Sequence, residues 1–112
     1  MRKIIASAIA AGFAIAIPSS AATTMLSSWY GPGFHGRLTA NGERYDMHSH
    51  TAAHKTLPFG TTMEVCYKRC TTVRINDRGP YIGARELDLS YGAARQIGLV
   101  HPGVATVEVK YM

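Results

Sequence analysis

Short apolar segments, separated by glycine, proline and polar residues, make up most of the chain from residue 23 onward. Valine and isoleucine alternate with arginine in residues 73–75, and two valines flank a polar residue in 107–109. This period of two is typical of strands that bury one face. We therefore expect strands over residues 25–31, 62–67, 70–77, 86–89 and 105–111.

One segment has the spacing of a helix instead. Tyr91, Ala94 and Ile97 recur at intervals of three, which places them on one helical face. Ser90 is a suitable N-terminal cap, and Gly98 is suited to end the helix. Five or six short strands with one convincing helix indicate a small, mainly β protein closed as a barrel, because closure removes exposed sheet edges.

The first 22 residues differ from the rest of the chain. Arg2 and Lys3 precede an uncharged, largely apolar run over residues 4–17, and small residues follow up to Ala22. This arrangement is typical of a secretory signal peptide, and we expect cleavage after Ala22. A membrane-spanning helix is the alternative, but it needs about 20 apolar residues. We therefore expect a single barrel domain over residues 23–112, periplasmic or secreted, with no membrane anchor.

The net charge of the chain by itself excludes few classes of partner. Loss of Arg2 and Lys3 would lower the formal net charge of +5 by two, and the remaining excess is spread along the chain without a basic run. A mild positive charge suits an anionic polymer such as a cell wall, although many exported proteins share it. Export and the lack of a basic helix argue against nucleic acid as a partner, and we expect a monomer.

Two cysteines, Cys66 and Cys70, lie between two of the expected strands. In an exported chain such a pair usually forms a disulfide, which here would close a hairpin tip around residues 67–69. A redox pair and a metal site are the alternatives, but two ligands are too few for structural zinc. Because the closed loop is short, the disulfide would contribute only about 2 kcal/mol through chain entropy.

The segment VRINDRGPY, residues 73–81, begins as a strand and then runs into Asn76, Asp77 and Arg78. The simplest interpretation of Asp77 is a turn residue before Gly-Pro. The alternative is a carboxyl at the end of a buried strand, at a place suited to acid–base chemistry. Asp88, which stands between two leucines, is expected to point away from them.

Three histidines, His48, His50 and His54, lie in MHSHTAAH. His48 and His50 on a strand would present two imidazoles on one face, as in a metal site. No carboxylate or thiolate stands nearby at ligand spacing, so surface histidines are the simpler interpretation. His54 lies between alanines and an apolar segment, where a partly buried ring needs a polar partner. No metal or cofactor is expected.

Aromatic residues cluster at the ends of the same segments: Trp29, Tyr30, Phe34, Phe59 and Tyr81. Most should serve packing in the core or at its rim. Aromatic faces also pack against the C–H faces of sugars, so the cluster is compatible with a glycan-binding groove without being diagnostic of one.

Five segments together resemble the catalytic domain of the rare lipoprotein A family. They are SWYGPGFHGRLTANGERYD, TAAHKTLPFGT, VRINDRGPY, ELDLSYGAARQIG and GVATVEVKY. They cover nearly all of residues 29–111 in the order found in the family. The resemblance implies a double-psi β-barrel, here six-stranded with one or two short helices. It also implies an exported lytic transglycosylase that acts on peptidoglycan, with a preference for glycan stripped of its peptides.

The resemblance implies Glu43, His54 and Asp77 as the catalytic set. Asp77 would protonate the leaving oxygen and then act as a base, Glu43 would stabilise the developing cation, and His54 would orient a carboxyl or the sugar. The substrate-binding residues that we expect around this set are Trp29, Tyr30, Phe59, Asn76, Arg78 and Tyr81.

The chain departs from the family pattern at three points. The usual lipid-attachment cysteine and the peptidoglycan-binding repeat domain are missing, and the Cys66–Cys70 hairpin replaces an open turn. The main alternative function is a non-catalytic module that binds and loosens wall polysaccharide, as expansins do with related barrels. A partner-binding role, as in small defence proteins with this barrel, is a third. The products of glycan digestion would distinguish these functions.

Overall fold

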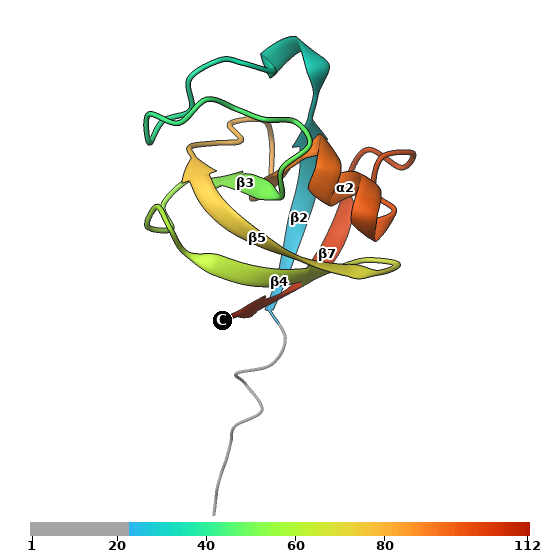
Figure 1. Cartoon of the computed structure of the whole chain (residues 1–112). Coiled ribbons are helices and arrows are strands. Elements are labelled where there is room, and N and C mark those ends of the chain that lie inside the picture. Colours follow the sequence, from blue (N-terminus) through green and yellow to red (C-terminus); the bar gives the residue numbers. More distant parts are fainter. Residues whose placement is uncertain (1–22) are drawn as a thin grey trace, which may run out of the picture.

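The computed structural model describes residues 23–112, and the expected signal peptide with its cleavage site lies outside the described residues. Six strands close into a barrel in the order β2-β6-β3-β5-β4-β7 (Figure 1). The strands are β2 (Thr23–Tyr30), β3 (Thr51–His54), β4 (Thr62–Cys66), β5 (Cys70–Asp77), β6 (Leu87–Ser90) and β7 (Ala105–Tyr111). One α-helix, α2 (Tyr91–Ile97), and one 3-10 turn, η3 (Pro32–Phe34), complete the described elements. The expected mainly β, six-stranded barrel is confirmed.

The sheet mixes parallel and antiparallel pairs. β2 runs parallel to β6, and β3 runs parallel to β5, whereas the other four neighbouring pairs are antiparallel. Parallel neighbours need crossover connections: the chain passes through β3, β4 and β5 between β2 and β6, and through β4 between β3 and β5. Strand β3 is the one that the sequence pattern did not separate from its surroundings, because its first three residues are all buried and do not alternate.

The alternation in the sequence fills the barrel interior. Val73 and Ile75 of β5 are fully buried, as are Val107 and Val109 of β7. They pack with leucines of β6 and with the methionine and valine of β4 in one apolar cluster. Burial of this set supplies the main stabilising free energy of the domain.

Helix α2 covers one side of the barrel, against β2, β5 and β6 (Figure 1). The hydroxyl of Ser90 accepts the N–H of Ala93, and Gly98 ends the helix with a φ of 88°. Both expected caps are therefore confirmed. The buried face of the helix consists of Ala93, Ala94 and Ile97. Among residues 23–112, no helix has the length and apolar character needed to cross a membrane.

The hairpin between β4 and β5 is closed by the expected disulfide between Cys66 and Cys70. Its tip is also tied to the end of α2, because the backbone N–H groups of Lys68 and Arg69 both donate to the carbonyl of Ile97, at 3.1 and 3.4 Å. The disulfide therefore closes the turn, and the two hydrogen bonds hold the hairpin tip against the helix.

Candidate active site

Asp77 ends strand β5, where the chain leaves the barrel wall. Its Oδ1 atom accepts the backbone N–H groups of Ala40 and Arg78, each at 2.9 Å. The side chain is half-buried. Gly79 follows with a φ of 117°, which a side chain would strain, and the chain turns away there. Asp77 is thus at a strand end, as expected.

Glu43 is held by four side-chain hydrogen bonds. Arg74 donates to both carboxylate oxygens, at 2.6 and 2.9 Å. Asn76 donates to Oε1 at 3.1 Å, and Asn41 donates to Oε2 at 3.0 Å. These donors, with Arg74 contributing most, lower the pKa of Glu43 to about 2. The carboxyl is therefore ionised throughout the physiological range, and its charge is offset by a bidentate partner.

Asp88 is a third carboxyl in this region, and it was not among the residues expected to act in catalysis. It lies on β6, where Leu87 and Leu89 point into the core and Asp88 to the other face. Burial raises the pKa of Asp88 to about 6; the hydroxyl of Ser28, which donates to Oδ1 at 2.9 Å, opposes the shift, and the charge of Asp77 adds to it. The alternation of Asp88 with two leucines in the sequence predicted that it points away from them, but nothing in the sequence predicted that it is buried.

Asp77 and Asp88 lie on strands that flank the same residue. Ala53 of β3 is the register partner of Asp77 on β5 and of Asp88 on β6. Two strand spacings separate the two backbones, on the order of 10 Å. A register shift between Ala52 and Ala53 brings Asp77 into this row. The barrel thus presents two carboxyls across a small methyl side chain.

Tyr30 ends strand β2 beside this row. Its ring stacks on Tyr45 with centroids 4.5 Å apart. Its buried hydroxyl lies close to the carboxyl of Asp77. Burial first, and the charge of Asp77 second, raise the pKa of Tyr30. Tyr45 was not singled out from the sequence. Its hydroxyl donates to the carbonyl of Tyr30 at 2.7 Å and accepts the backbone N–H of Tyr91 at 3.1 Å.

His54 ends strand β3 and has a fixed ring orientation. Its Nδ1 atom accepts the backbone N–H groups of Thr56 and Leu57, both at 3.1 Å. Burial lowers the pKa of His54, against the opposing charge of Glu86. The neutral ring therefore carries its proton on Nε2 and acts there as a donor. It borders a cleft of about 220 Å³ with Lys55, Thr56 and Glu86.

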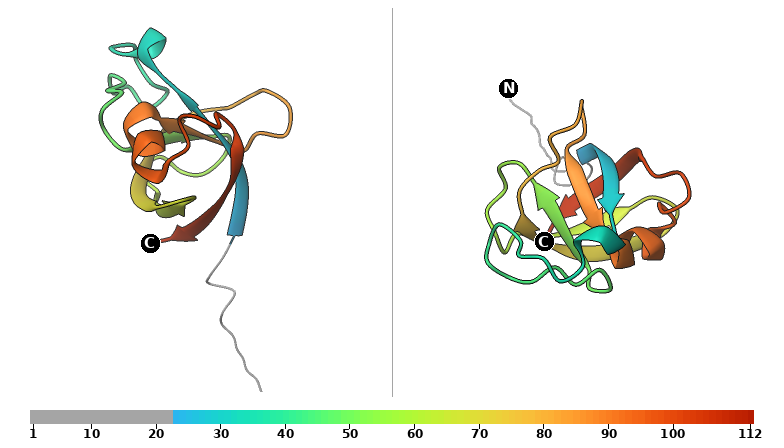
Figure 2. Two further views of the ribbon diagram at one scale, coloured as in Figure 1. Left: turned by 90° about the vertical axis from the view of Figure 1, so that its right-hand side faces the viewer. Right: turned by 90° about the horizontal axis from the view of Figure 1, so that it is seen from above.

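The other substrate-binding residues that we expected from the sequence lie in three separate places. Arg78 lies 3.9 Å above the ring of Phe59 and donates to the carbonyl of His54 at 3.2 Å, so both surround the end of β3. Tyr81 is 73% exposed, on the segment 79–86 that projects from the barrel (Figure 2). Trp29 is placed elsewhere, because its ring packs on Tyr91 and its N–H donates to the carbonyl of Val100 at 3.2 Å.

A family model described as lytic transglycolase matches residues 22–109. The chain belongs to the lytic transglycolase family. This membership accounts for the order of the motifs around Glu43, His54 and Asp77 along one barrel.

Several curated members of the lytic transglycolase family are similar in sequence. The probable endolytic peptidoglycan transglycosylase RlpA of Synechocystis sp. is 59% identical over 85 residues, which are 73% of this chain and 26% of that protein. The endolytic peptidoglycan transglycosylase RlpA of Campylobacter jejuni is 51% identical, covering 76% of this chain and 32% of that protein. The corresponding Vibrio cholerae protein is 53% identical over 75% and 33%. The chain thus spans about a quarter to a third of the length of these relatives.

Two solved structures share the barrel. The Streptomyces papain inhibitor superposes with a TM-score of 0.65 at 24% identity, over 81% of this chain and 94% of that one. The Clavibacter michiganensis expansin superposes with a TM-score of 0.66 at 18% identity, over 81% of this chain and 50% of that one. At these identities the likeness extends to the fold alone.

The four donors around Glu43 lead to a prediction for its titration. We expect Arg74→Gln to raise the pKa of Glu43 from about 2 toward its ordinary value near 4.5, because the first of its causes is removed. Carbon-detected NMR titration of the Glu43 carboxyl measures this directly. Since the folded pKa lies below the unfolded one, Glu43 stabilises the fold above about pH 4.5, and this contribution is lost as the pH falls toward 2.

Arg44→Gln is the matched control, because Arg44 belongs to the same loop and donates to the carbonyl of Gly36 rather than to Glu43. An unchanged Glu43 titration in Arg74→Gln, or an equal shift in both variants, would contradict the assigned cause.

Proposed function

We propose that this chain is the catalytic domain of an exported endolytic peptidoglycan transglycosylase. The reaction breaks the glycan between N-acetylmuramic acid and N-acetylglucosamine and leaves 1,6-anhydro-muramic ends. The observation that carries the proposal is the pair Asp77 and Asp88 on either side of Ala53, with the pKa of Asp88 raised to about 6. The relatives named as peptidoglycan transglycosylases support it.

The proposed chemistry needs one transferable proton and no water. A carboxyl protonates the leaving O4 oxygen while the bond from C1 to that oxygen breaks. The C6 hydroxyl of the same muramic residue then forms the new bond to C1 and gives its proton back to the enzyme. A group that holds a proton near neutral pH is suited to the first step. The pKa of about 6 brings Asp88 closer to this condition than an ordinary aspartate, and Asp77 lies at the strand end.

We therefore assign proton transfer to the two aspartates together. Asp88 is the group that still carries a proton around pH 6, and Asp77 at the strand end passes the proton to the leaving oxygen and takes up the one that the C6 hydroxyl releases. The acid–base role that the sequence implied for Asp77 remains within this assignment. The proton that the C6 hydroxyl releases restores the pair, so each turnover begins from the same state.

Glu43 receives a different role from the one that its sequence motif implied. A carboxylate saturated by Arg74, Asn76 and Asn41 has little free charge to offer a developing cation. We assign it as a positioning residue, because it ties the segment of Ala40, which donates to Asp77, onto strand β5. The neutral His54, with its proton on Nε2, is assigned to donate a hydrogen bond to the sugar.

Product analysis tests the function. We expect the protein to release anhydro-muramic products from purified glycan, and Asp77→Asn to release none while keeping its circular dichroism spectrum and melting temperature. Mass spectrometry distinguishes the outcomes, because hydrolysis would add water and create reducing ends instead. Binding without any product would favour the alternative, a wall-binding module of the expansin kind, and retained turnover in Asp77→Asn would refute the role of that residue.

The raised pKa of Asp88 gives a second prediction. We expect kcat to fall as the pH rises through about 6, because Asp88 then loses its proton. Asp88→Asn should reduce kcat by about 100-fold and remove this dependence on pH.

The same raised pKa predicts how stability depends on pH. Because the pKa of Asp88 in the folded protein lies above its ordinary value near 3.8, the unfolding free energy of the parent should decrease as the pH rises from about 4 through 6. Asp88→Asn should lack that decrease, as measured by urea denaturation. A variant with the parental profile would refute the role.

We further propose that the protein acts outside the cytoplasm, in the periplasm or the medium. The signal-like residues 1–22 and the location of peptidoglycan support this. N-terminal sequencing of the exported protein should begin at Thr23, whereas a start at Met1 would contradict cleavage.

A further inference from the structure

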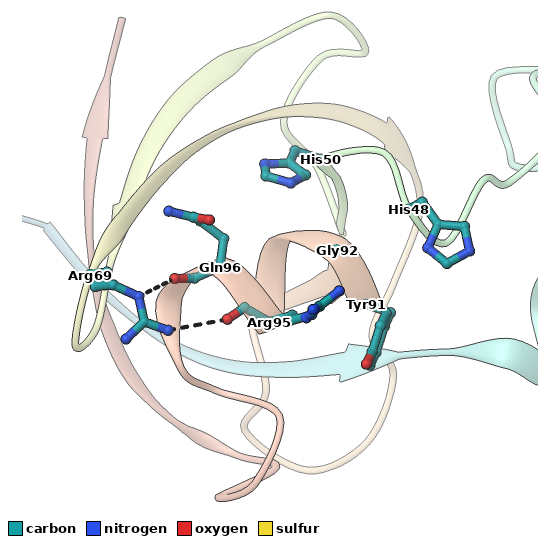
Figure 3. A pocket seen from close by; sticks show the side chains of 7 residues that line it. All are labelled: His48, His50, Arg69, Tyr91, Gly92, Arg95 and Gln96. Carbon is teal, nitrogen blue, oxygen red and sulfur yellow. Dashed lines mark hydrogen bonds between the residues drawn. The ribbon is translucent and has the colours of Figure 1, made fainter.

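A second cleft lies on the side of the molecule covered by helix α2. It encloses about 430 Å³ between α2, the tip of the β4–β5 hairpin and the segment just before β3 (Figure 3). Two histidines and two arginines line it together with a tyrosine, a glycine and a glutamine, and no acidic residue is among them. The proposed chemistry at Asp77 and Asp88 uses none of these side chains.

Arg69 is fixed at one end of the cleft. Its Nε atom donates to the carbonyl of Gln96 at 2.7 Å, and its Nη2 atom donates to the carbonyl of Arg95 at 3.3 Å (Figure 3). The disulfide-closed hairpin holds the backbone of the same residue. Within residues 23–112 nothing accepts from Nη1. The arginine is therefore held in place with donor capacity left over.

Arg95 is the second cation, and it projects from the exposed side of α2. No carboxylate of residues 23–112 forms an ion pair with it, since the one pair there joins Arg74 to Glu43. Asp46, which is outside the lining, accepts the backbone N–H of His48 at 2.9 Å and the hydroxyl of Ser49 at 3.1 Å. The positive charge of the cleft is thus left without a counter-charge in its lining.

The opposite wall is built by close backbone packing. The N–H of Gly92 donates to the carbonyl of Met47 at 2.7 Å, and a Cβ at Gly92 would lie 2.6 Å from the carbonyl oxygen of His48. Only a glycine allows this approach of the 47–50 segment to the helix. His50 is oriented by a 2.7 Å hydrogen bond between its Nδ1 atom and the hydroxyl of Thr71. Both walls are therefore held by defined contacts.

Such a lining matches carboxylate groups. Guanidinium groups bind carboxylates through parallel hydrogen bonds, and imidazole and amide N–H groups add single donors. His50 directly precedes β3, and Ala53 near the other end of β3 lies between Asp77 and Asp88. A strand of this length spans on the order of 10 Å, so one extended polymer can reach both places.

We propose that this cleft binds carboxylates of the peptidoglycan strand, outside the residues that break the bond. The inference rests on the proposed function for the identity of the polymer. Peptidoglycan carries carboxylates in two places, on the lactyl groups of muramic acid where peptides have been removed and on the peptides themselves. The chemistry recognised is the same, and the experiment distinguishes the two sources.

The test measures binding in the Asp77→Asn background, which prevents cleavage. The variant Arg95→Gln with His48→Gln removes two exposed lining groups without touching the hairpin staple. Lys110→Gln is the matched control, because this exposed lysine of β7 lies outside the cleft. The probes are peptide-free glycan strands, peptide-bearing glycan strands and an uncharged N-acetylglucosamine oligomer of equal length, with dissociation constants from calorimetry at low salt.

We expect the cleft variant to bind the carboxylate-bearing strand about tenfold more weakly, with the control within about twofold, because charge-assisted hydrogen bonds are lost. Binding of the uncharged oligomer should not change, and salt should weaken the parent more than the variant. The strand that shows the difference identifies the source of the carboxylate. Equal affinities of variant and parent for both charged strands, or an equal loss with the uncharged oligomer, would overturn the proposal.

This outcome is independent of catalysis. A protein that yields no anhydro products but shows Arg95-dependent binding would lose the proposed enzymatic function and keep the carboxylate site. A protein that yields those products with binding unaffected by Arg95→Gln and His48→Gln would keep the function and lose the site.

Discussion

The ion pair between Glu43 and Arg74 joins segment 31–50, the longest connection between strands within residues 23–112, to the strand that ends in Asp77. The two side chains are 41% and 42% exposed, and exposed ion pairs by themselves contribute little. Here the carboxylate also takes donors from Asn41 and Asn76, so four hydrogen bonds fix one group. The residues from 31 to 50 add no strand to the barrel, and their position over its end therefore depends on such contacts.

Closure of the barrel positions the carboxyls of Asp77 and Asp88. Asp77 and Asp88 lie on strands that do not pair with each other, and they flank the same residue because β3 pairs with β5 on one side and with β6 on the other. A slip of one residue would turn either side chain to the opposite face. Ala53, which lies between them, carries only a methyl group. The closed sheet thus positions the two groups to which we assign proton transfer, and it stabilises the domain as well.

The sequence predicted the features that depend on neighbouring residues. Alternation at Val73 and Ile75, the helix caps and the hairpin disulfide are all local, and all are confirmed. The role of Arg74 was not predicted, because in the strand pattern it was only the polar residue between two apolar ones. The burial of Asp88 against Ser28 was not predicted either, since sixty residues separate the two along the chain. Tertiary contacts decide the properties of both.

The environments of Glu43 and Asp88 shift the pKa values of two chemically similar groups in opposite directions. Hydrogen bonds lower one pKa to about 2, and burial raises the other to about 6. Opposite shifts within one site are the usual means by which an enzyme assigns different roles to its carboxyls. A group ionised at every physiological pH can position neighbours but has no proton to give. A buried group near 6 can hold a proton and release it. On this argument the proton of the reaction belongs with the aspartates of the barrel wall, and Glu43 belongs with the structure that surrounds them.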